Sequence, residues 1–140
     1  MARTIPPPRL KPEARPGLFR RTPPAIFPPI LGLFGLGIAW RRGQGAFGLP
    51  DAPVEGLLGA VTLLFLFALL AYGAKVAMRP RVLTEDFRTL PGRAGLAALT
   101  MSLMMLAATL LPYAPRAAAW VLAGGVVLHG LVAAAALRIF

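Results

Sequence analysis

Long apolar stretches alternate with short polar connections over almost the whole chain after residue 24. A helix needs about 20 mainly apolar residues to cross the hydrocarbon core of a bilayer, so four such stretches predict four membrane-spanning helices. The pattern therefore predicts an all-α, polytopic membrane protein whose transmembrane domain covers residues 23–140. The apolar stretches are Ala25–Trp40, Val54–Met78, Ala94–Leu111 and Ala117–Leu137, and the predicted helices cover about 25–41, 54–78, 94–111 and 117–138.

The composition agrees with a membrane location. Hydrophobic residues make up 57% of the chain and charged residues only 14%, whereas soluble domains carry charge on about a quarter of their residues. The net charge of +10 does not indicate nucleic acid, because the basic residues flank apolar stretches. Lipid headgroups are the expected partners of these cations. The chain has no cysteine, which excludes disulfides and thiolate metal sites.

The lysine and arginine residues fall mainly on alternate connections. Six precede the first stretch and five lie at or between the second and third, whereas the other two connections carry two and one. Cationic connections stay on the cytoplasmic side, so both termini are predicted to be cytoplasmic, at the inner membrane of the cell. The stretches then form two hairpins of identical orientation. Two short, similar entries indicate that the hairpins are parallel repeats, Arg21-Thr22-Pro23 and Arg88-Thr89-Leu90-Pro91.

Residues 1–22 form a different kind of segment, rich in proline and arginine. Prolines at this density prevent a continuous helix or strand. No apolar region with a cleavage site follows, so a disordered cytoplasmic tail is predicted rather than a signal peptide. The first apolar stretch is short and contains Pro28 and Pro29. Either residues 25–29 are non-helical and line a cavity, or a regular helix starts late, at the membrane interface.

Candidate pore-lining residues in the first stretch include a set with almost no side-chain bulk. Gly32, Gly35 and Ala39 recur at helical spacing on one face, a pattern that favours close packing of another helix over a pore surface. Pro28 belongs to the same candidate set. Phe27 and Phe34 could plug a pore, but packing or contact with lipid is favoured for them.

The third stretch is more polar than the others. Ser102, Met105 and Thr109 share one face of the predicted helix. Three alternatives are open for the hydroxyl groups of Ser102 and Thr109. They bond back to their own helix, which is the commonest outcome, or they line a polar path, or they hold a neighbouring helix. The irregular first and third stretches are therefore predicted to lie inside, and the smoother second and fourth stretches outside.

His129 lies close to the middle of the fourth stretch, after Gly124 and Gly125. A fully charged side chain at that depth costs about 2.5 kcal/mol or more, and a histidine avoids this cost by staying neutral. No carboxylate lies in the centre of any stretch to pair with it. A neutral histidine hydrogen-bonded to an adjacent helix is therefore favoured over a role in proton or ion transfer.

Three segments together resemble a known family. They are the glycine- and leucine-rich run Phe27–Arg41, the pair Tyr72 and Lys75, and Glu85-Asp86-Phe87 followed by Pro91 and Arg93. They are similar to the first helix, the end of the second helix and the entry to the third helix in the tellurite-resistance and dicarboxylate transporter family. That family includes the slow anion channels of guard cells, and the resemblance covers residues 23–140.

The resemblance implies ten helices in five hairpins around a central pore, with the odd-numbered helices lining it and subunits that form trimers. Members of the family pass or export anions such as chloride, nitrate, sulfite, malate or tellurite-related species. Here Pro28 and Pro29 replace the glycine and aromatic residues that usually precede the first helix, and the gating phenylalanine belongs to a late helix that this chain lacks. The chain is therefore expected to be the N-terminal part of such a protein.

The predicted function is transmembrane transport, as the N-terminal portion of an anion channel or exporter. The expected partners are the lipid bilayer, a small anion and further copies of the chain, without nucleic acid. The alternative is a small accessory or structural membrane protein that packs against a larger complex through its glycine faces. An enzyme is not predicted and no cofactor or metal is expected, because the residues lack paired carboxylates, a metal-ligand cluster or a nucleophile beside a base.

Overall fold

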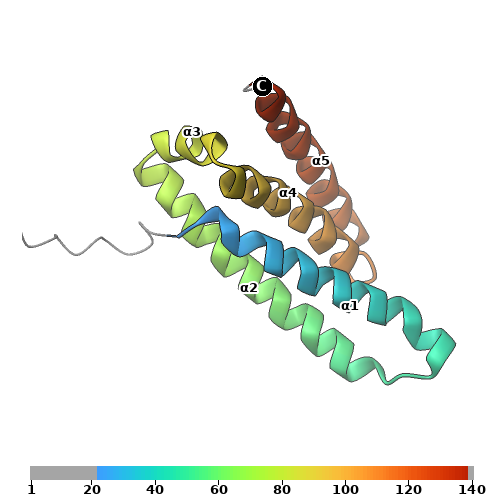
Figure 1. Ribbon diagram of the computed structural model, residues 1–140. Coiled ribbons are helices and arrows are strands. Elements are labelled where there is room, and N and C mark those ends of the chain that lie inside the picture. Colours follow the sequence, from blue (N-terminus) through green and yellow to red (C-terminus); the bar gives the residue numbers. More distant parts are fainter. Residues whose placement is uncertain (1–21, 139–140) are drawn as a thin grey trace, which may run out of the picture.

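The computed structural model describes residues 22–138, which form helices joined by short connections (Figure 1). Four of these helices are long and apolar enough to cross a membrane. The predicted all-α class is confirmed, and the architecture is that of a multi-pass membrane protein. The predicted tail lies outside the described residues apart from Thr22. The elements are the 3-10 turn η1 (Pro24–Ile26), α1 (Phe27–Phe47), α2 (Asp51–Met78), α3 (Arg81–Arg88), α4 (Leu90–Leu110) and α5 (Pro115–Leu137).

The first helix differs from its predicted bounds of 25–41. The regular α-helix begins at Phe27 and holds Pro28 and Pro29 in its first turn, where their missing N–H groups have no helical partner to lose. Residues 25–29 are helical, as part of η1 and the first turn of α1, so the alternative of a non-helical segment is not observed. The helix continues past Arg41 to Phe47 and ends at Gly48, whose positive φ of 61° provides a left-handed cap. The predicted helix ended at Arg41 because the apolar stretch ends there, but the observed helix continues through polar residues to Phe47.

The short helix α3 was not predicted. Its residues are mostly polar, so hydropathy gave no signal for it, yet Val82 is buried beneath it. α4 begins directly afterwards, with the Thr89 side chain accepting a hydrogen bond from the Gly92 amide at 3.2 Å as its cap. A side chain at Gly92 would collide with the Asp86 backbone, so this glycine permits the tight corner between α3 and α4.

α4 occupies the centre of the molecule and packs against both α1 and α5, while α2 packs against the other side of α1 (Figure 1). Near its start α1 approaches α4 closely, because a side chain at Gly95 would collide with the Pro24 backbone. Near the other end of α1, Arg41 bonds to the carbonyl of Thr109. α1 and α4 therefore lie side by side and run in the same direction.

Burial separates the helices differently from the predicted inner and outer pairs. Half of the apolar window of α4 is buried inside the molecule, against 6% for α5, which agrees with the prediction for these two helices. The buried share of the apolar window is nearly equal in α1 and α2, at 28% and 33%. α2 buries one stripe along its length, so burial does not distinguish α2 as an outer helix from α1 as an inner one. The stripe is formed by Val54, Leu58, Val61, Phe65, Ala68, Ala71 and Tyr72.

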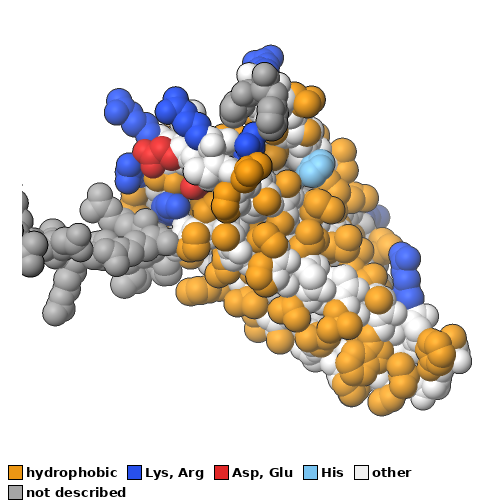
Figure 2. All heavy atoms as spheres, in the orientation of Figure 1, with side chains coloured by type: hydrophobic (Ala, Val, Ile, Leu, Met, Phe, Trp, Pro, Cys, Tyr) orange, Lys and Arg blue, Asp and Glu red, His pale blue; other side chains and the backbone are white. Residues whose placement is uncertain are grey.

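The molecule has two ends that differ in charge. The α3 end, which carries α3, the start of α1 and the end of α5, holds six of the described cations, whereas the far end, with the α1–α2 and α4–α5 connections, holds three. Figure 2 shows lysine and arginine side chains gathered over α3. The cations of the α3 end are Lys75, Arg79, Arg81, Arg88, Arg93 and Arg138, and those of the far end are Arg41, Arg42 and Arg116.

Candidate functional site

The predicted pore-lining phenylalanines lie in the packed core. Phe27 and Phe34 are completely buried, and both meet the ring of Phe65 on α2 edge to face, with centroids 6.2 Å and 5.9 Å apart. Such edge-to-face pairs add to the stabilisation from buried area. The ring of Tyr72 meets Phe27 in the same way at 5.8 Å. These aromatic rings fasten α1 to α2.

The small residues of α1 lie on its other side and remain uncovered. Pro28, Gly32, Gly35 and Ala39 are exposed at helical spacing, and we call them the open face of α1. Apart from the backbone of α1 itself, no described atom lies within 4 Å of the position that a side-chain carbon would take at Gly32 or Gly35. The described residues therefore provide no partner for a surface on which another backbone could approach closely.

The predicted residues of α4 are mostly buried. Thr109 donates a hydrogen bond to the carbonyl of Met105 at 2.9 Å, which is the back-bonding expected as the commonest outcome, and Met105 is half-buried. Ser102 is completely buried, and its hydroxyl has no hydrogen-bond partner among residues 22–138. Within the described part of the chain, these side chains are not brought together with the open face of α1 around a channel.

His129 on α5 contacts the adjacent helix α4 through Thr100. The His129 Nδ1 lies 2.8 Å from the Thr100 Oγ1, which also lies 2.8 Å from the carbonyl oxygen of Ala97. The threonine has a single hydroxyl proton, and a carbonyl can only accept. If both hydrogen bonds are made, Nδ1 must donate its proton to Thr100. A neutral imidazole satisfies this arrangement, with Nε2 left as an acceptor.

A cluster of polar side chains at the far end joins three parts of the chain. Arg41 Nε donates to Glu55 Oε1 at 2.8 Å, and Nη2 donates to Oε2 at 2.6 Å. The third guanidinium nitrogen, Nη1, donates to the carbonyl of Thr109 at 3.2 Å. Tyr113, in the α4–α5 connection, donates its hydroxyl proton to Glu55 Oε2. We call Arg41, Glu55 and Tyr113 the Arg41 cluster, and it fixes α1, α2 and the end of α4 to one another.

A second cluster of the same composition lies at the α3 end. Tyr72 donates its hydroxyl proton to Asp86 Oδ2 at 2.8 Å, and the Lys75 Nζ lies 3.7 Å from the same oxygen. Lys75 also donates to the carbonyl of Thr22 at 2.9 Å. We call Lys75, Asp86 and Tyr72 the Lys75 cluster. It holds α3 against α2 and ties the segment before α1 to the same point.

The tyrosine of each cluster also faces the cation of that cluster. The Arg41 guanidinium carbon lies 5.9 Å from the centre of the Tyr113 ring, and the Lys75 Nζ lies 5.5 Å from the centre of the Tyr72 ring, distances at which cation–π attraction acts. The hydrogen bond to Glu55 raises the pKa of Tyr113. Tyr113 therefore stays protonated, and remains a hydrogen-bond donor, up to a higher pH than a free tyrosine does.

The sequence indicated parts of these clusters but not their pairing. Arg41 was recognised as the end of the glycine- and leucine-rich run, and Tyr72 and Lys75 as residues that resemble the end of a family helix. Nothing in the pattern linked Tyr113 to Glu55 or Thr100 to His129, because these partners are 58 and 29 residues apart. Among residues 22–138, no group of three histidine, aspartate or glutamate side chains could hold a metal ion.

Searches against protein-family models, curated proteins and solved structures found no match to this chain. The resemblance to the tellurite-resistance and dicarboxylate transporter family therefore remains a prediction from the sequence. A proposal about function therefore rests on the arrangement of the helices and on the open face of α1.

Proposed function

We propose that this chain acts in transmembrane transport, as part of the wall of an anion-conducting pathway that further helices complete. The observation that supports this proposal most directly is that α1 and α4 run side by side in the same direction while the open face of α1 stays uncovered. In a transporter built from parallel hairpins, the first helix of each hairpin occupies equivalent positions. α1 and α4 would be these first helices, with α2 and α5 as the returning ones.

The proposed mechanism is positioning and electrostatics, without a chemical step. Small side chains on the open face of α1 leave room for an ion beside the helix. The six cations of the α3 end create a positive potential that attracts anions. Because basic segments stay inside, the proposal places the α3 end and both termini in the cytoplasm, with the two hairpins in identical orientation at the inner membrane.

Further helices are part of the proposal because Phe27, Phe34 and Ser102 are buried in the core and line no opening among residues 22–138. Copies of the same chain, in a trimer, or a larger protein of the plan implied by the family resemblance could supply these helices. In either case the open face of α1 is the surface that they meet.

Anion flux into proteoliposomes tests the proposal. Purified protein, shown to be helical after reconstitution, should conduct a small anion above the level of empty vesicles, and Gly35→Leu should lower the flux. Gly130→Leu on α5 is the matched control, because a side chain there also meets no described atom within 4 Å, and it should leave the flux unchanged. No flux from the folded, unaltered protein would refute a pathway that copies of this chain complete by themselves.

The second candidate is an accessory protein that packs against a larger membrane complex. The same open face supports it, because small residues at helical spacing are a common surface for helix association in lipid. The two candidates differ in their response to Gly35→Leu. An accessory protein would show no flux of its own, and the substitution would weaken its association with other helices, as measured by energy transfer between labelled chains in vesicles.

A further inference from the structure

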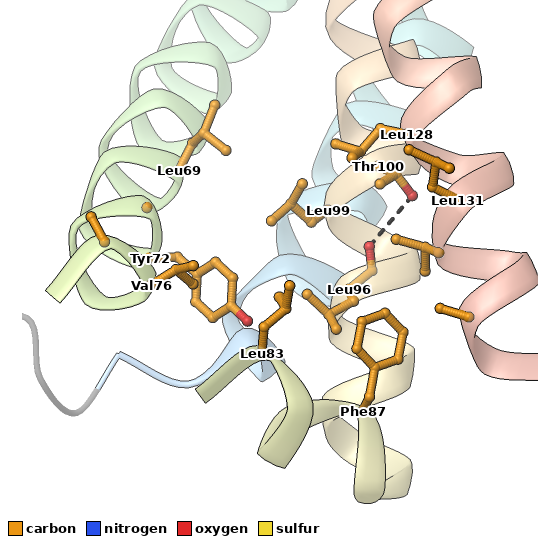
Figure 3. Close-up of a pocket in the computed structure, with 14 residues that line it drawn as sticks. Leu69, Tyr72, Val76, Leu83, Phe87, Leu96, Leu99, Thr100, Leu128 and Leu131 are labelled. Carbon is orange, nitrogen blue, oxygen red and sulfur yellow. Dashed lines mark hydrogen bonds between the residues drawn. The ribbon is translucent and has the colours of Figure 1, made fainter. Parts of the chain in front are cut away.

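A groove of about 630 Å³ opens between α2 and α5, with α4 as its floor and α3 closing one end (Figure 3). Leu69 and Val76 come from α2, Phe87 from α3, Leu99 from α4 and Leu131 from α5. The lining is almost entirely apolar. The groove arises because α5 packs mainly against α4, which leaves its side toward α2 unfilled.

Cations without a described counter-ion gather at the α3 end of this groove. Arg81 and Arg88 lie on α3, the helix that contributes the groove residues Leu83 and Phe87, and Arg138 follows the groove residue Ala135 at the end of α5. None of the three forms an ion pair with another residue of the described part of the chain. By contrast, Lys75 pairs with Asp86 and Arg79 pairs with Glu85 at 2.9 Å.

We propose that the groove binds an anionic phospholipid, with one acyl chain along α4 and the phosphate near Arg81, Arg88 and Arg138. The two parts of the site match the two parts of such a lipid, because the apolar groove leads to the basic end. Basic sites between transmembrane helices on one side of a membrane are suited to anionic headgroups. This inference does not depend on the proposed anion transport.

The size of the groove favours an acyl chain over a protein helix. A spanning helix about 10 Å across and 30 Å long occupies roughly 2,400 Å³, nearly four times the groove volume of about 630 Å³. A slender chain can lie within the groove, whereas most of a helix would stand outside it. Since lipid tails are as apolar as the groove walls, selectivity comes from the headgroup, and each arginine changes the preference by about five-fold.

Fluorescence quenching by brominated lipids tests this site in the full chain. Leu131→Trp places a reporter in the groove, in a background of Trp40→Phe and Trp120→Phe, which removes the two natural tryptophans. Ala133→Trp is the matched control, because Ala133 is exposed on the same helix and does not line the groove. The protein is reconstituted in mixtures of phosphatidylcholine and phosphatidylglycerol, with one of the two lipids brominated.

Leu131→Trp should be quenched at a lower mole fraction of brominated phosphatidylglycerol than of brominated phosphatidylcholine, and Ala133→Trp should be quenched equally by both. Equal quenching at the groove would overturn the proposal. So would shielding of the groove reporter from both lipids while the control is quenched, because a protein segment would then fill the groove.

Replacement of the cations tests the headgroup part of the site. Arg81→Gln, Arg88→Gln and Arg138→Gln together should lower the preference for phosphatidylglycerol at the groove by at least about ten-fold. The matched control is Arg42→Gln with Arg116→Gln at the far end, which should not change it. If the triple variant fails to insert, raising the salt to about 1 M should reduce the preference of the Leu131→Trp protein. A preference unaffected by both charge removal and salt would overturn the proposal.

Discussion

A cluster of the same three kinds of side chain lies at each end of α2, but the two clusters connect different numbers of helices. The Arg41 cluster and the Lys75 cluster each combine a cation, a carboxylate and a tyrosine that donates to the carboxylate. The Arg41 cluster connects α1, α2 and the end of α4, so it joins three of the four long helices. The Lys75 cluster connects α2 to the neighbouring helix α3 and to Thr22. The same chemistry therefore supports tertiary packing at one end and a local attachment at the other.

The choice of cation explains part of this difference. The planar guanidinium of Arg41 holds both oxygens of Glu55 and still reaches the carbonyl of Thr109 with its remaining nitrogen. The ammonium of Lys75 acts as a point charge and lies 3.7 Å from Asp86. Arg41 therefore has the stronger directional bonds, although Glu55 is more exposed than Asp86, with 35% of its side chain accessible against 17%.

The largest expected effect is from Glu55→Gln. The substitution leaves the guanidinium of Arg41, whose side chain is 18% accessible, without its counter-ion. It should destabilise the fold by about 1–2 kcal/mol, because solvent screens a pair in which 35% of the Glu55 side chain is accessible. Unfolding in mixed detergent micelles, followed by helicity, measures the loss. Asp51→Asn is the control at the same end, with an expected cost of at most about 1 kcal/mol through the helix dipole. Equal costs would show that the Arg41 cluster does not hold the helices together.

Asp86→Asn should have a smaller and local effect. The neutral side chain loses its attraction to Lys75 and accepts the Tyr72 hydrogen bond less strongly, so we expect a loss of about 1 kcal/mol. Hydrogen exchange should become faster in α3 while α4 keeps its protection. Glu85→Gln, which removes only the exposed pair with Arg79, is the control. Loss of protection throughout α4 would contradict the local role of the Lys75 cluster.

Exchange of the two cations should sharpen the comparison further. Arg41→Lys removes the two-pronged bond to Glu55 and the bond to Thr109, and should cost about 1 kcal/mol. Lys75→Arg keeps a positive charge beside Asp86 and should change stability by less than about 0.5 kcal/mol. The same unfolding measurement applies to both. A larger cost at Lys75 than at Arg41 would reverse the assignment of the stronger bonds.

The smallest effect concerns the titration of Tyr113. Its ordinary pKa of 10.0 is raised because the hydroxyl donates to the Glu55 carboxylate. The hydrogen bond therefore stabilises the fold fully below pH 10, and its contribution is lost as the pH rises through the raised pKa of Tyr113. Phenolate absorbance in a Tyr72→Phe background measures this titration. Adding Glu55→Gln should shift it back to lower pH, and an unchanged titration would show that Glu55 is not the cause.

Much of the fold was predictable because hydropathy and length are properties of single segments. The four long apolar helices, the place of Pro28 and Pro29 in the first turn of α1 and the back-bonded hydroxyl of Thr109 follow from local rules. The helix α3 was missed because it has only eight residues and most of them are polar, so it contains no long apolar stretch. The extension of α1 to Phe47 was missed because Arg41 was counted as the end of an apolar stretch, whereas the helix continues through the polar residues that follow it.

The candidate site was less accessible to prediction. Phe27, Gly32, Phe34 and Gly35 were grouped as pore-lining candidates, and the structure divides them between a buried aromatic core and an uncovered face of the same helix. Helical spacing alone allows this division, since Phe27 and Phe34 share one face and Gly32 and Gly35 occupy another. Which face meets α2 depends on Phe65 and Tyr72, more than 30 residues later in the chain.

The sequence by itself determined that this chain is all-helical, that four segments suit a membrane and that its described cations concentrate at one end. The tertiary structure decided that α4 is central and α5 peripheral, which tyrosine meets which carboxylate, and that Thr100 is the partner of His129. The physical reason is that lipid and a protein interior are equally apolar. A residue buried between helices and one facing lipid therefore have the same hydropathy, and only the packing distinguishes them.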